Sequence, residues 1–484
     1  MLQLSDPSLL KSEAFIGGKW IKGGKRFAVK NPSTGETIAE VADLGAEETR
    51  VAIDAASAMF PAWKKMLAKE RAALLRKWFE LMMANQDDLA RIMTAEQGKP
   101  LAESRGEIAY GASFIEWFAE EAKRVYGDVI PAPAAGRKLI VMKEPIGVVA
   151  AITPWNFPNA MITRKCGPAL AAGCTFVNKP AQETPLSALA LAELAQRAGI
   201  PAGVFNVVTG RDARAIGKEL TESAIVRKFS FTGSTQVGKI LMRQCASTVK
   251  KISLELGGNA PFIVFDDADL DAAADGAMLS KFRNMGQTCV CANRLLVQDK
   301  VYDAFAEKLS ARIAKLKVGD GFADGVTQGP LITMDAVEKV EGLLKDATAK
   351  GAKITLGGKR GEGQFFEPTL VRDVTPSMQI AKEEIFGPVA TLFRFKDDED
   401  AIRISNDTEF GLAAYFYARD VGRIFRVAGA LEYGIIGINE GIISTEVAPF
   451  GGMKESGLGR EGSKYGIEDY LEIKYLALGG LGDV

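Results

Sequence analysis

The spacing of hydrophobic residues changes several times along the chain, and each change predicts a different kind of element. Between residues 15 and 39, apolar and polar residues alternate between turns rich in glycine, which predicts a short β ribbon. From 46 to 121, apolar residues recur every three or four positions, a spacing typical of amphipathic helices. We therefore expect a ribbon followed by a layer of helices that packs on another element.

From residue 146 to 265, short apolar runs alternate with helical segments, a rhythm typical of βαβ units and a parallel sheet. A second α/β set is predicted from 260 to about 462, and we place the boundary near Gly257 and Gly258, where the alternation resumes. Ligands bind open parallel sheets beyond the carboxyl ends of their strands. The residues at the predicted ends are Pro154, Trp155, Asn156, Lys179, Pro180, Gly210, Gly233 and Ser234.

Two extended segments lie outside this rhythm. Residues 124–145 are proline-rich and alternating, and residues 470–484 form another extended apolar run. Exposed strand edges are usually paired in proteins. We therefore expect the two segments to pair as a projecting arm that is buried in a homo-oligomer, either a dimer or a tetramer.

Composition argues against a nucleic-acid-binding, disulfide-stabilised or membrane-bound protein. The net charge of −1 gives no basic excess for nucleic acid, and five cysteines, an odd number in 484 residues, argue against a disulfide framework. No signal peptide is recognisable at the N-terminus, and the longest apolar run, 146–155, is too short to span a bilayer. We expect a cytoplasmic protein without membrane attachment.

The chain contains no histidine. This excludes Ser-His-Asp and Cys-His hydrolases, as well as metal sites that need imidazole, and we predict no metal site. Cys289 lies in the polar segment GQTCVCANR, unlike a core cysteine. Glu255 lies in the apolar segment ISLELGG, where a buried carboxylate must be paired or have a shifted pKa. Cys289 and Glu255 are the candidate nucleophile and base.

Three further features allow two interpretations each. Cys291 is either a small core residue, which we favour, or a redox partner that forms a reversible bridge with Cys289. The segment FTGSTQVG at 231–238 is either a phosphate site at a helix N-terminus or a tight βα turn. Lys179 is either a ligand for a ribose hydroxyl or phosphate, or a surface lysine.

Several segments occur in a fixed order along the chain: PWNFP, NKP, FTGS, LELGG, GQTC, EEIFGPV and APFGGMKESGLGRE. In this order and spacing they resemble the NAD(P)-dependent aldehyde dehydrogenases over essentially the whole chain. The resemblance implies an α/β fold with a Rossmann-type cofactor domain, an α/β catalytic domain and a small β arm for oligomerisation. The implied bounds are 1–123 and 146–257 for the cofactor domain, 258–469 for the catalytic domain, and 124–145 and 470–484 for the arm.

The resemblance also implies roles for single residues. Cys289 attacks the aldehyde as a thiolate, the Asn156 amide and the Cys289 backbone N–H stabilise the oxyanion, and Glu255 activates the water that hydrolyses the thioester. Glu384 holds the nicotinamide ribose and Phe386 lies beside the ring. The rest of the implied cofactor site is Thr153, Pro154, Trp155, Lys179, Ala181, Gln182, Gly210, Gly233, Ser234 and Leu256.

The cofactor preference depends on Gln182, which stands where many NAD-preferring relatives have glutamate. A neutral amide does not repel a 2′-phosphate as a carboxylate does, and Arg211 adds positive charge nearby. We therefore expect NADP to be preferred, with NAD also used.

Within the family, MITRKCGPALAAGC, KFRNMGQTCVCANR, GINEGIISTEVAPFGG and GREGSKYGIEDYLEIKYL resemble the branch that oxidises succinate semialdehyde. A distal carboxylate needs cations, and Arg164 and Arg283 are candidates for a clamp, assisted by the Ser444 hydroxyl. Alternatives are glutarate semialdehyde or another aldehyde with a remote carboxylate, and an inactive structural or binding protein on the same scaffold. A CoA-acylating enzyme is disfavoured by Glu255, because that reaction needs no water-activating base.

Overall fold

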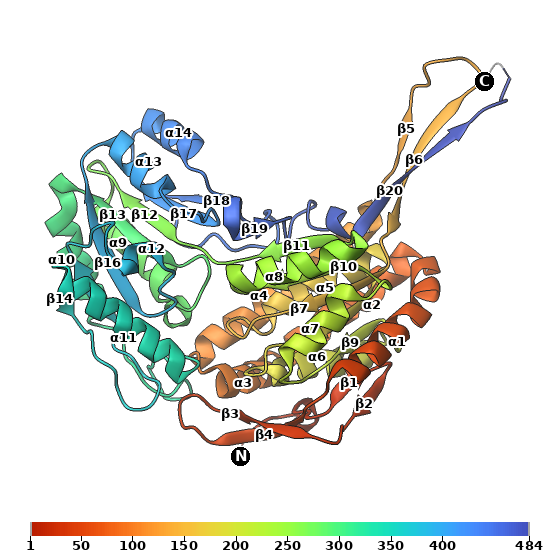
Figure 1. The fold of residues 1–484 in the computed structure, drawn as a ribbon, viewed down its shortest axis with the longest axis horizontal. Helices are drawn as coiled ribbons and strands as arrows, with labels where there is room; N and C mark the ends of the chain where they lie inside the picture. The colour runs from red at the N-terminus through yellow and green to blue at the C-terminus, as the bar shows by residue number, and fades with distance from the viewer. Residues whose placement is uncertain (1, 483–484) are drawn as a thin grey trace.

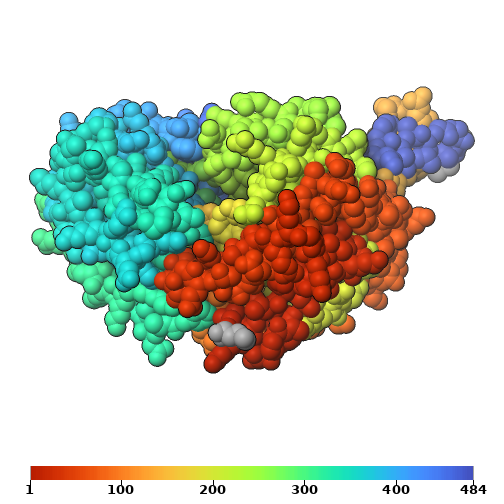
Figure 2. Space-filling view, turned by 60° about the horizontal axis from the view of Figure 1, so that its bottom comes forward, coloured from red at the N-terminus to blue at the C-terminus, as the bar shows by residue number. Residues whose placement is uncertain are grey.

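The structure is a computed structural model that describes residues 2–482 of the chain. Two large sheets, each covered by helices, lie side by side, and a three-stranded sheet projects from one of them (Figure 1). In the space-filling view the two parts meet along a hollow (Figure 2). Short 3-10 helices complete the elements: η1 (Pro7–Leu9), η2 (Ala122–Arg124), η3 (Ala246–Thr248), η4 (Arg283–Gly286), η5 (Asp299–Val301), η6 (Lys454–Ser456) and η7 (Glu468–Tyr470).

The first sheet contains the strand–helix rhythm predicted from residue 146, and its strand order is β19-β11-β10-β7-β8-β9-β1-β2. Its parallel strands are β7 (Val148–Ile152), β8 (Thr175–Lys179), β9 (Phe205–Val207), β10 (Val226–Thr232) and β11 (Lys251–Glu255). The helices between them are α5 (Ala160–Ala172), α6 (Pro185–Ala198), α7 (Ala213–Glu222) and α8 (Thr235–Cys245). The chain builds outward from β7 to β9 and then returns to the other side of β7, so the order reverses between β7 and β10. Open α/β sheets bind ligands at such a reversal, beyond the carboxyl ends of the strands.

The predicted ribbon is present but is divided between two sheets. Strands β1 (Ala14–Ile16) and β2 (Lys19–Ile21) extend the first sheet, while β3 (Arg26–Lys30) and β4 (Thr37–Ala42) pair only with each other. The predicted helical layer is confirmed as α1 (Ala46–Lys65), α2 (Ala68–Ala84), α3 (Gln86–Gln97) and α4 (Leu101–Glu121). Helices α2 and α4 join α5 and α6 around buried Trp78, Phe114 and Phe176 on one face of the sheet. Helices α1, α7 and α8 cover the other face.

The second sheet has the order β14-β15-β16-β13-β12-β17-β18, and all its pairings are parallel except that of β14 with β15. Its strands are β12 (Ala260–Val264), β13 (Ala292–Gln298), β14 (Lys353–Leu356), β15 (Thr369–Arg372), β16 (Val389–Phe395), β17 (Ala413–Tyr417) and β18 (Ile435–Ile438). Its helices are α9 (Leu270–Phe282), α10 (Tyr302–Ile313), α11 (Met334–Ala349), α12 (Gln379–Lys382), α13 (Asp398–Asn406) and α14 (Val421–Ala430). Near the C-terminus, β19 (Gly457–Leu458) returns to pair with β11 of the first sheet, so the chain links both sheets twice.

The expected arm is present. Strand β20 (Leu471–Leu478) pairs along its whole length with β6 (Lys138–Pro145), which also pairs with β5 (Asp128–Ile130). Apolar side chains such as Val129 and Ile473 are exposed on it. Residues 483 and 484 of the expected arm, like residue 1, lie outside the described residues.

Candidate active site

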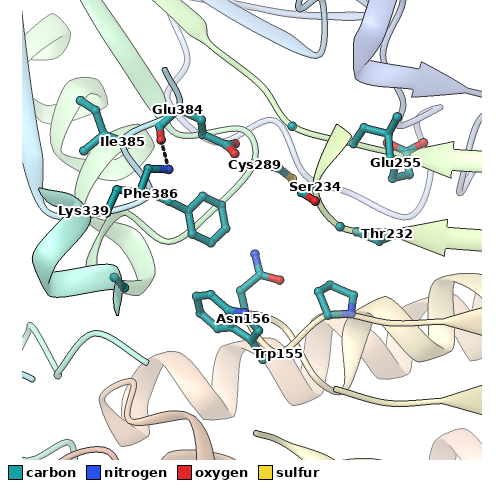
Figure 3. Close-up of a pocket in the computed structure, with 15 residues that line it drawn as sticks. Trp155, Asn156, Thr232, Ser234, Glu255, Cys289, Lys339, Glu384, Ile385 and Phe386 are labelled. Carbon is teal, nitrogen blue, oxygen red and sulfur yellow. Dashed lines mark hydrogen bonds between the residues drawn. The ribbon is translucent and has the colours of Figure 1, made fainter. Parts of the chain in front are cut away.

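A cavity of about 280 Å³ lies where the first sheet faces the second (Figure 3). The carboxyl ends of β7, β10 and β11 form one wall, on both sides of the reversal in strand order. Turns of the second sheet and helix α11 form the other. The lining residues are Pro154, Trp155, Asn156, Thr232, Gly233, Ser234, Glu255, Leu256, Gly257, Cys289, Ala336, Lys339, Glu384, Ile385 and Phe386.

Cys289 reaches the cavity from a tight turn between α9 and β13. Asn284 and Met285 in this turn have positive φ angles of 51° and 55°. The Asn284 side chain donates to the backbone oxygens of Asn156, at 2.9 Å, and Gln287, at 3.2 Å, which ties the turn to the opposite wall. Cys289 is partly exposed, whereas the other cysteines are buried. Burial of the thiol raises the pKa of Cys289 to about 12, and Glu384 adds to the shift while Arg164 opposes it.

Asn156 is held on two sides. Its Nδ2 donates to the backbone oxygen of Gln287 at 3.0 Å, and its own backbone oxygen accepts from Lys99 Nζ at 2.8 Å. A primary amide has two N–H groups. One N–H of Asn156 therefore remains free to donate to a ligand in the cavity.

Glu255 ends strand β11 and is only 3% exposed, yet its Oε2 has no hydrogen-bond partner among residues 2–482. Burial raises the pKa of Glu255 well above its usual value, and the nearby carboxylate of Glu461 raises it further. Arg164 and Lys165 act in the opposite direction. A buried carboxyl with a free oxygen and a raised pKa has the properties of a general base or acid.

Glu384 approaches from the opposite wall, with Cys289 between the two carboxylates in the close-up view (Figure 3). Its Oε1 accepts from the Gly258 backbone N–H at 3.1 Å, and its backbone oxygen accepts from Lys339 Nζ at 2.6 Å. Burial raises the pKa of Glu384 to about 7. Beside it, the rings of Phe386 and Trp155 meet edge to face with centroids 5.6 Å apart.

Other predicted cofactor residues lie outside this cavity: Thr153, Lys179, Ala181, Gln182 and Gly210. Lys179 is buried rather than on the surface, and its Nζ donates to the adjacent Pro180 carbonyl. Gln182 and Arg211 line a separate cavity of about 270 Å³. Arg211 pairs with Asp43 at 3.0 Å, a partner that the sequence did not indicate.

The three predicted substrate residues also lie outside the lining of the cavity, and the two arginines differ. Arg164 is 2% exposed, and its Nε lies 2.7 Å from Glu461 Oε2. Arg283 has no carboxylate partner among residues 2–482, and its guanidinium stacks on the Phe157 ring at 5.4 Å. Arg164 thus already has a carboxylate partner, and the role of both arginines in a substrate clamp stays a prediction.

Cys291 is buried, as the core interpretation predicts, and its thiol donates to the backbone oxygen of Lys281 at 3.5 Å. A bridge with Cys289 stays a prediction.

Sequence reasoning missed some lining residues. Gly257 and Thr232 adjoin segments that were recognised. Lys339 is an exposed residue of α11 and has no local signal, because only the fold brings it to Glu384. The full set of missed residues is Thr232, Gly257, Ala336, Lys339 and Ile385.

No helix within residues 2–482 combines the length and apolarity that a membrane crossing requires. Nor do three or more Cys, Asp or Glu side chains gather within that range as a metal would need.

Comparisons with known proteins agree with this geometry. The sequence model of the aldehyde dehydrogenase family matches residues 20–476. The chain is 66% identical to the glutarate-semialdehyde dehydrogenase of Pseudomonas putida, over 99% of this chain and 100% of that protein. It is also 66% identical, with the same coverage, to the NADP(+) succinate-semialdehyde dehydrogenase of Escherichia coli. A crystal structure described as an E. coli NADP-dependent enzyme has a TM-score of 0.98 and 65% identity, over 99% of this chain and 100% of that one.

Proposed function

The chain belongs to the aldehyde dehydrogenase family, and from that premise we propose that it oxidises succinate semialdehyde to succinate with NADP⁺ or NAD⁺. Glutarate semialdehyde, one methylene longer, is the alternative, because relatives named for each substrate are equally similar to this chain. One observation carries the proposal: Cys289, Glu255 and Asn156 line one cavity. The inactive-scaffold alternative has no such support, because the proposed nucleophile, base and amide are all present.

We assign the cofactor to residues 1–123 and 146–257 and catalysis to 258–469. The reversal of strand order between β7 and β10 supports the first assignment. The buried ammonium of Lys179, which has one neighbouring carbonyl as its partner, fits a ribose hydroxyl. Ser234 at the N-terminus of α8 fits a phosphate, because free backbone N–H groups gather there. When bound, the nicotinamide supplies a hydride acceptor.

The protein's own residues perform the remaining steps in this proposal. The Cys289 thiol releases its proton to water and adds to the aldehyde carbon as a thiolate. The free N–H of Asn156 and the Cys289 backbone N–H stabilise the oxyanion. After oxidation the acyl group remains on Cys289 as a thioester. Glu255 accepts a proton from the attacking water, which releases the acid and restores the thiol.

We further propose that the arm, residues 124–145 and 470–484, mediates a homo-oligomer, a dimer or a tetramer. Its exposed Val129, Ile473 and Tyr475 support burial against another copy.

A substrate and cofactor panel, measured by the absorbance of the reduced nicotinamide, tests the proposal. We expect succinate or glutarate semialdehyde to have a higher kcat/KM than hexanal, free acid to form without CoA, and NADP⁺ to be preferred over NAD⁺. Equal kcat/KM for hexanal would contradict recognition of a distal carboxylate. A higher kcat/KM with NAD⁺ would reverse only the cofactor preference.

We also propose that Cys291 can form a reversible disulfide with Cys289 when a peroxide supplies the oxidising equivalents. The two residues lie in the same turn, and the bridge would remove the nucleophile. Peroxide should inactivate the wild type, dithiothreitol should restore activity, and Cys291→Ala should lose this recovery. Activity that persists under peroxide would rule the bridge out.

A further inference from the structure

Tyr110 on helix α4 has a buried hydroxyl group close to the side chain of Ser444. Within residues 2–482, its Oη makes no hydrogen bond of good geometry. Leaving such a group unpaired costs about 1–3 kcal/mol, so buried hydroxyls usually have partners. A group of this kind close to a reactive site is explained if a ligand supplies its partner.

The surroundings of Tyr110 indicate what that ligand is. Its ring meets Phe114 edge to face at 5.1 Å, and it packs with Phe157 in one apolar cluster. Each of these rings carries a guanidinium: Arg164 over Phe114 at 5.7 Å, and Arg283 over Phe157 at 5.4 Å. The Tyr110 hydroxyl therefore lies in the positive potential of two guanidinium groups, which favours binding of an anion beside it.

The two cations are not equivalent. Arg164 is buried against the Glu461 carboxylate, while Arg283 has no such partner in the described chain. The side chain of Ser444 also lies beside the Tyr110 hydroxyl. Burial raises the pKa of Tyr110 despite the arginines, so its hydroxyl stays protonated and can donate. A guanidinium and a neutral O–H donor together match the oxygens of a carboxylate.

Close packing holds this corner in place. A Cβ on Gly111 would lie 2.1 Å from Asn159 Oδ1, so α4 packs against the start of α5 without room for a side chain. Ser113 Oγ donates to Glu446 Oε2 at 3.2 Å and ties the loop that carries Ser444 to the same helix. Arg164 lies within electrostatic range of both Tyr110 and Cys289, which places the corner near the nucleophile.

We propose that Tyr110 is a specificity-determining residue whose hydroxyl donates to the distal carboxylate of the substrate, while Arg283 holds the same carboxylate. The inference rests on the proposed function and deepens it. The substrate class is short aldehydes with a terminal carboxylate.

Tyr110→Phe tests the proposal, because it removes the hydroxyl and keeps the ring. A hydrogen bond to a charged group predicts a fall of about 10- to 100-fold in kcat/KM for succinate semialdehyde, mainly through KM. The kcat/KM for butanal, which lacks the carboxylate, should stay within about 2-fold. Tyr465→Phe, at an exposed tyrosine, is the matched control and should change neither substrate.

The comparison of the two substrates separates the possible failures. If wild-type enzyme does not prefer succinate semialdehyde over butanal, the proposed function fails and this inference fails with it. If the wild type prefers it and Tyr110→Phe retains the preference, or loses activity equally on both substrates, only the role of Tyr110 is overturned. Should Tyr110→Phe not fold, Tyr110→Leu gives a second hydroxyl-free side chain in the same apolar cluster, judged by the same ratio.

Discussion

The cavity has a carboxylate at each end, and the two are held in different ways. Glu384, from the second sheet, accepts a hydrogen bond from Gly258, and its segment is tied down by Lys339. Glu255, from the first sheet, has an oxygen with no hydrogen-bond partner in the described part of the chain and lies near a second carboxylate, Glu461. A carboxylate held by donors suits binding, whereas a free one with a raised pKa suits proton transfer. The contrast predicts that neutralising each group will damage a different step.

The largest effect should follow from Glu255→Gln. Loss of a general base typically costs about 100- to 10,000-fold, so steady-state turnover should fall by that factor. Acylation of Cys289 does not need the base in the proposed mechanism. Rapid mixing should therefore still record a burst of about one reduced nicotinamide per active site.

The burst is the control for this variant, because a misfolded site would lose it. If Glu255→Gln lost the burst and turnover together, Glu255 would also be needed before the thioester forms. The functional difference between the two ends of the cavity would then disappear.

A smaller effect is expected from Glu384→Gln. The amide can still accept from Gly258 but gives up the negative charge, so a hydrogen bond from a ribose hydroxyl should weaken. The KM for NADP⁺ should rise by about 10-fold, with a smaller change in kcat. Glu383→Gln, at the exposed neighbouring residue, is the matched control. A variant with unchanged cofactor KM and strongly reduced kcat would give Glu384 a role in the reaction rather than in binding.

The residues at the two ends of the cavity also differ in whether the sequence pattern predicted them. The strand–helix rhythm predicted the sheet in which β11 ends at Glu255 and the loop after β7 carries Asn156, because apolar runs of strand length can be recognised in a sequence. Glu384 lies in a turn between α12 and β16, and the pattern of residues gave no sign of it. Only its resemblance to a family motif marked it.

Long-range pairing was the part that could not be predicted. Arg164 and Glu461 form an ion pair, as do Arg211 and Asp43, across more than a hundred residues of chain. No periodicity encodes such contacts, because they depend on how the sheets and loops pack. The return of β19 to β11 was missed for the same reason, as its two residues are too short to read as a strand.

The smallest predicted effect concerns stability, and it applies to the better-held carboxylate. The pKa of Glu384 is raised from 4.5 to about 7 in the folded protein. Below pH 4.5 the Glu384 carboxyl is protonated in both the folded and the unfolded protein, so its pKa shift does not lower the free energy of unfolding. As pH rises towards 7, the unfolded chain releases this proton before the folded one does, so stability falls. At pH 8 the loss is at most about 3 kcal/mol, and less to the extent that the partly exposed side chain is solvated.

Glu384→Gln removes this loss of stability, because glutamine carries no charge at any pH. At pH 8 the variant should melt a few degrees above the wild type, and at pH 5 the two melting temperatures should be closer. Thermal unfolding of cofactor-free protein at both pH values measures the gap, and Glu383→Gln corrects for the general effect of losing a charge. An equal difference in melting temperature between variant and wild type at both pH values would mean that the fold does not disfavour the ionised form of Glu384. The Gly258 N–H would then fully compensate its burial, and Glu255 alone would carry the raised pKa that distinguishes a reacting carboxylate from a binding one.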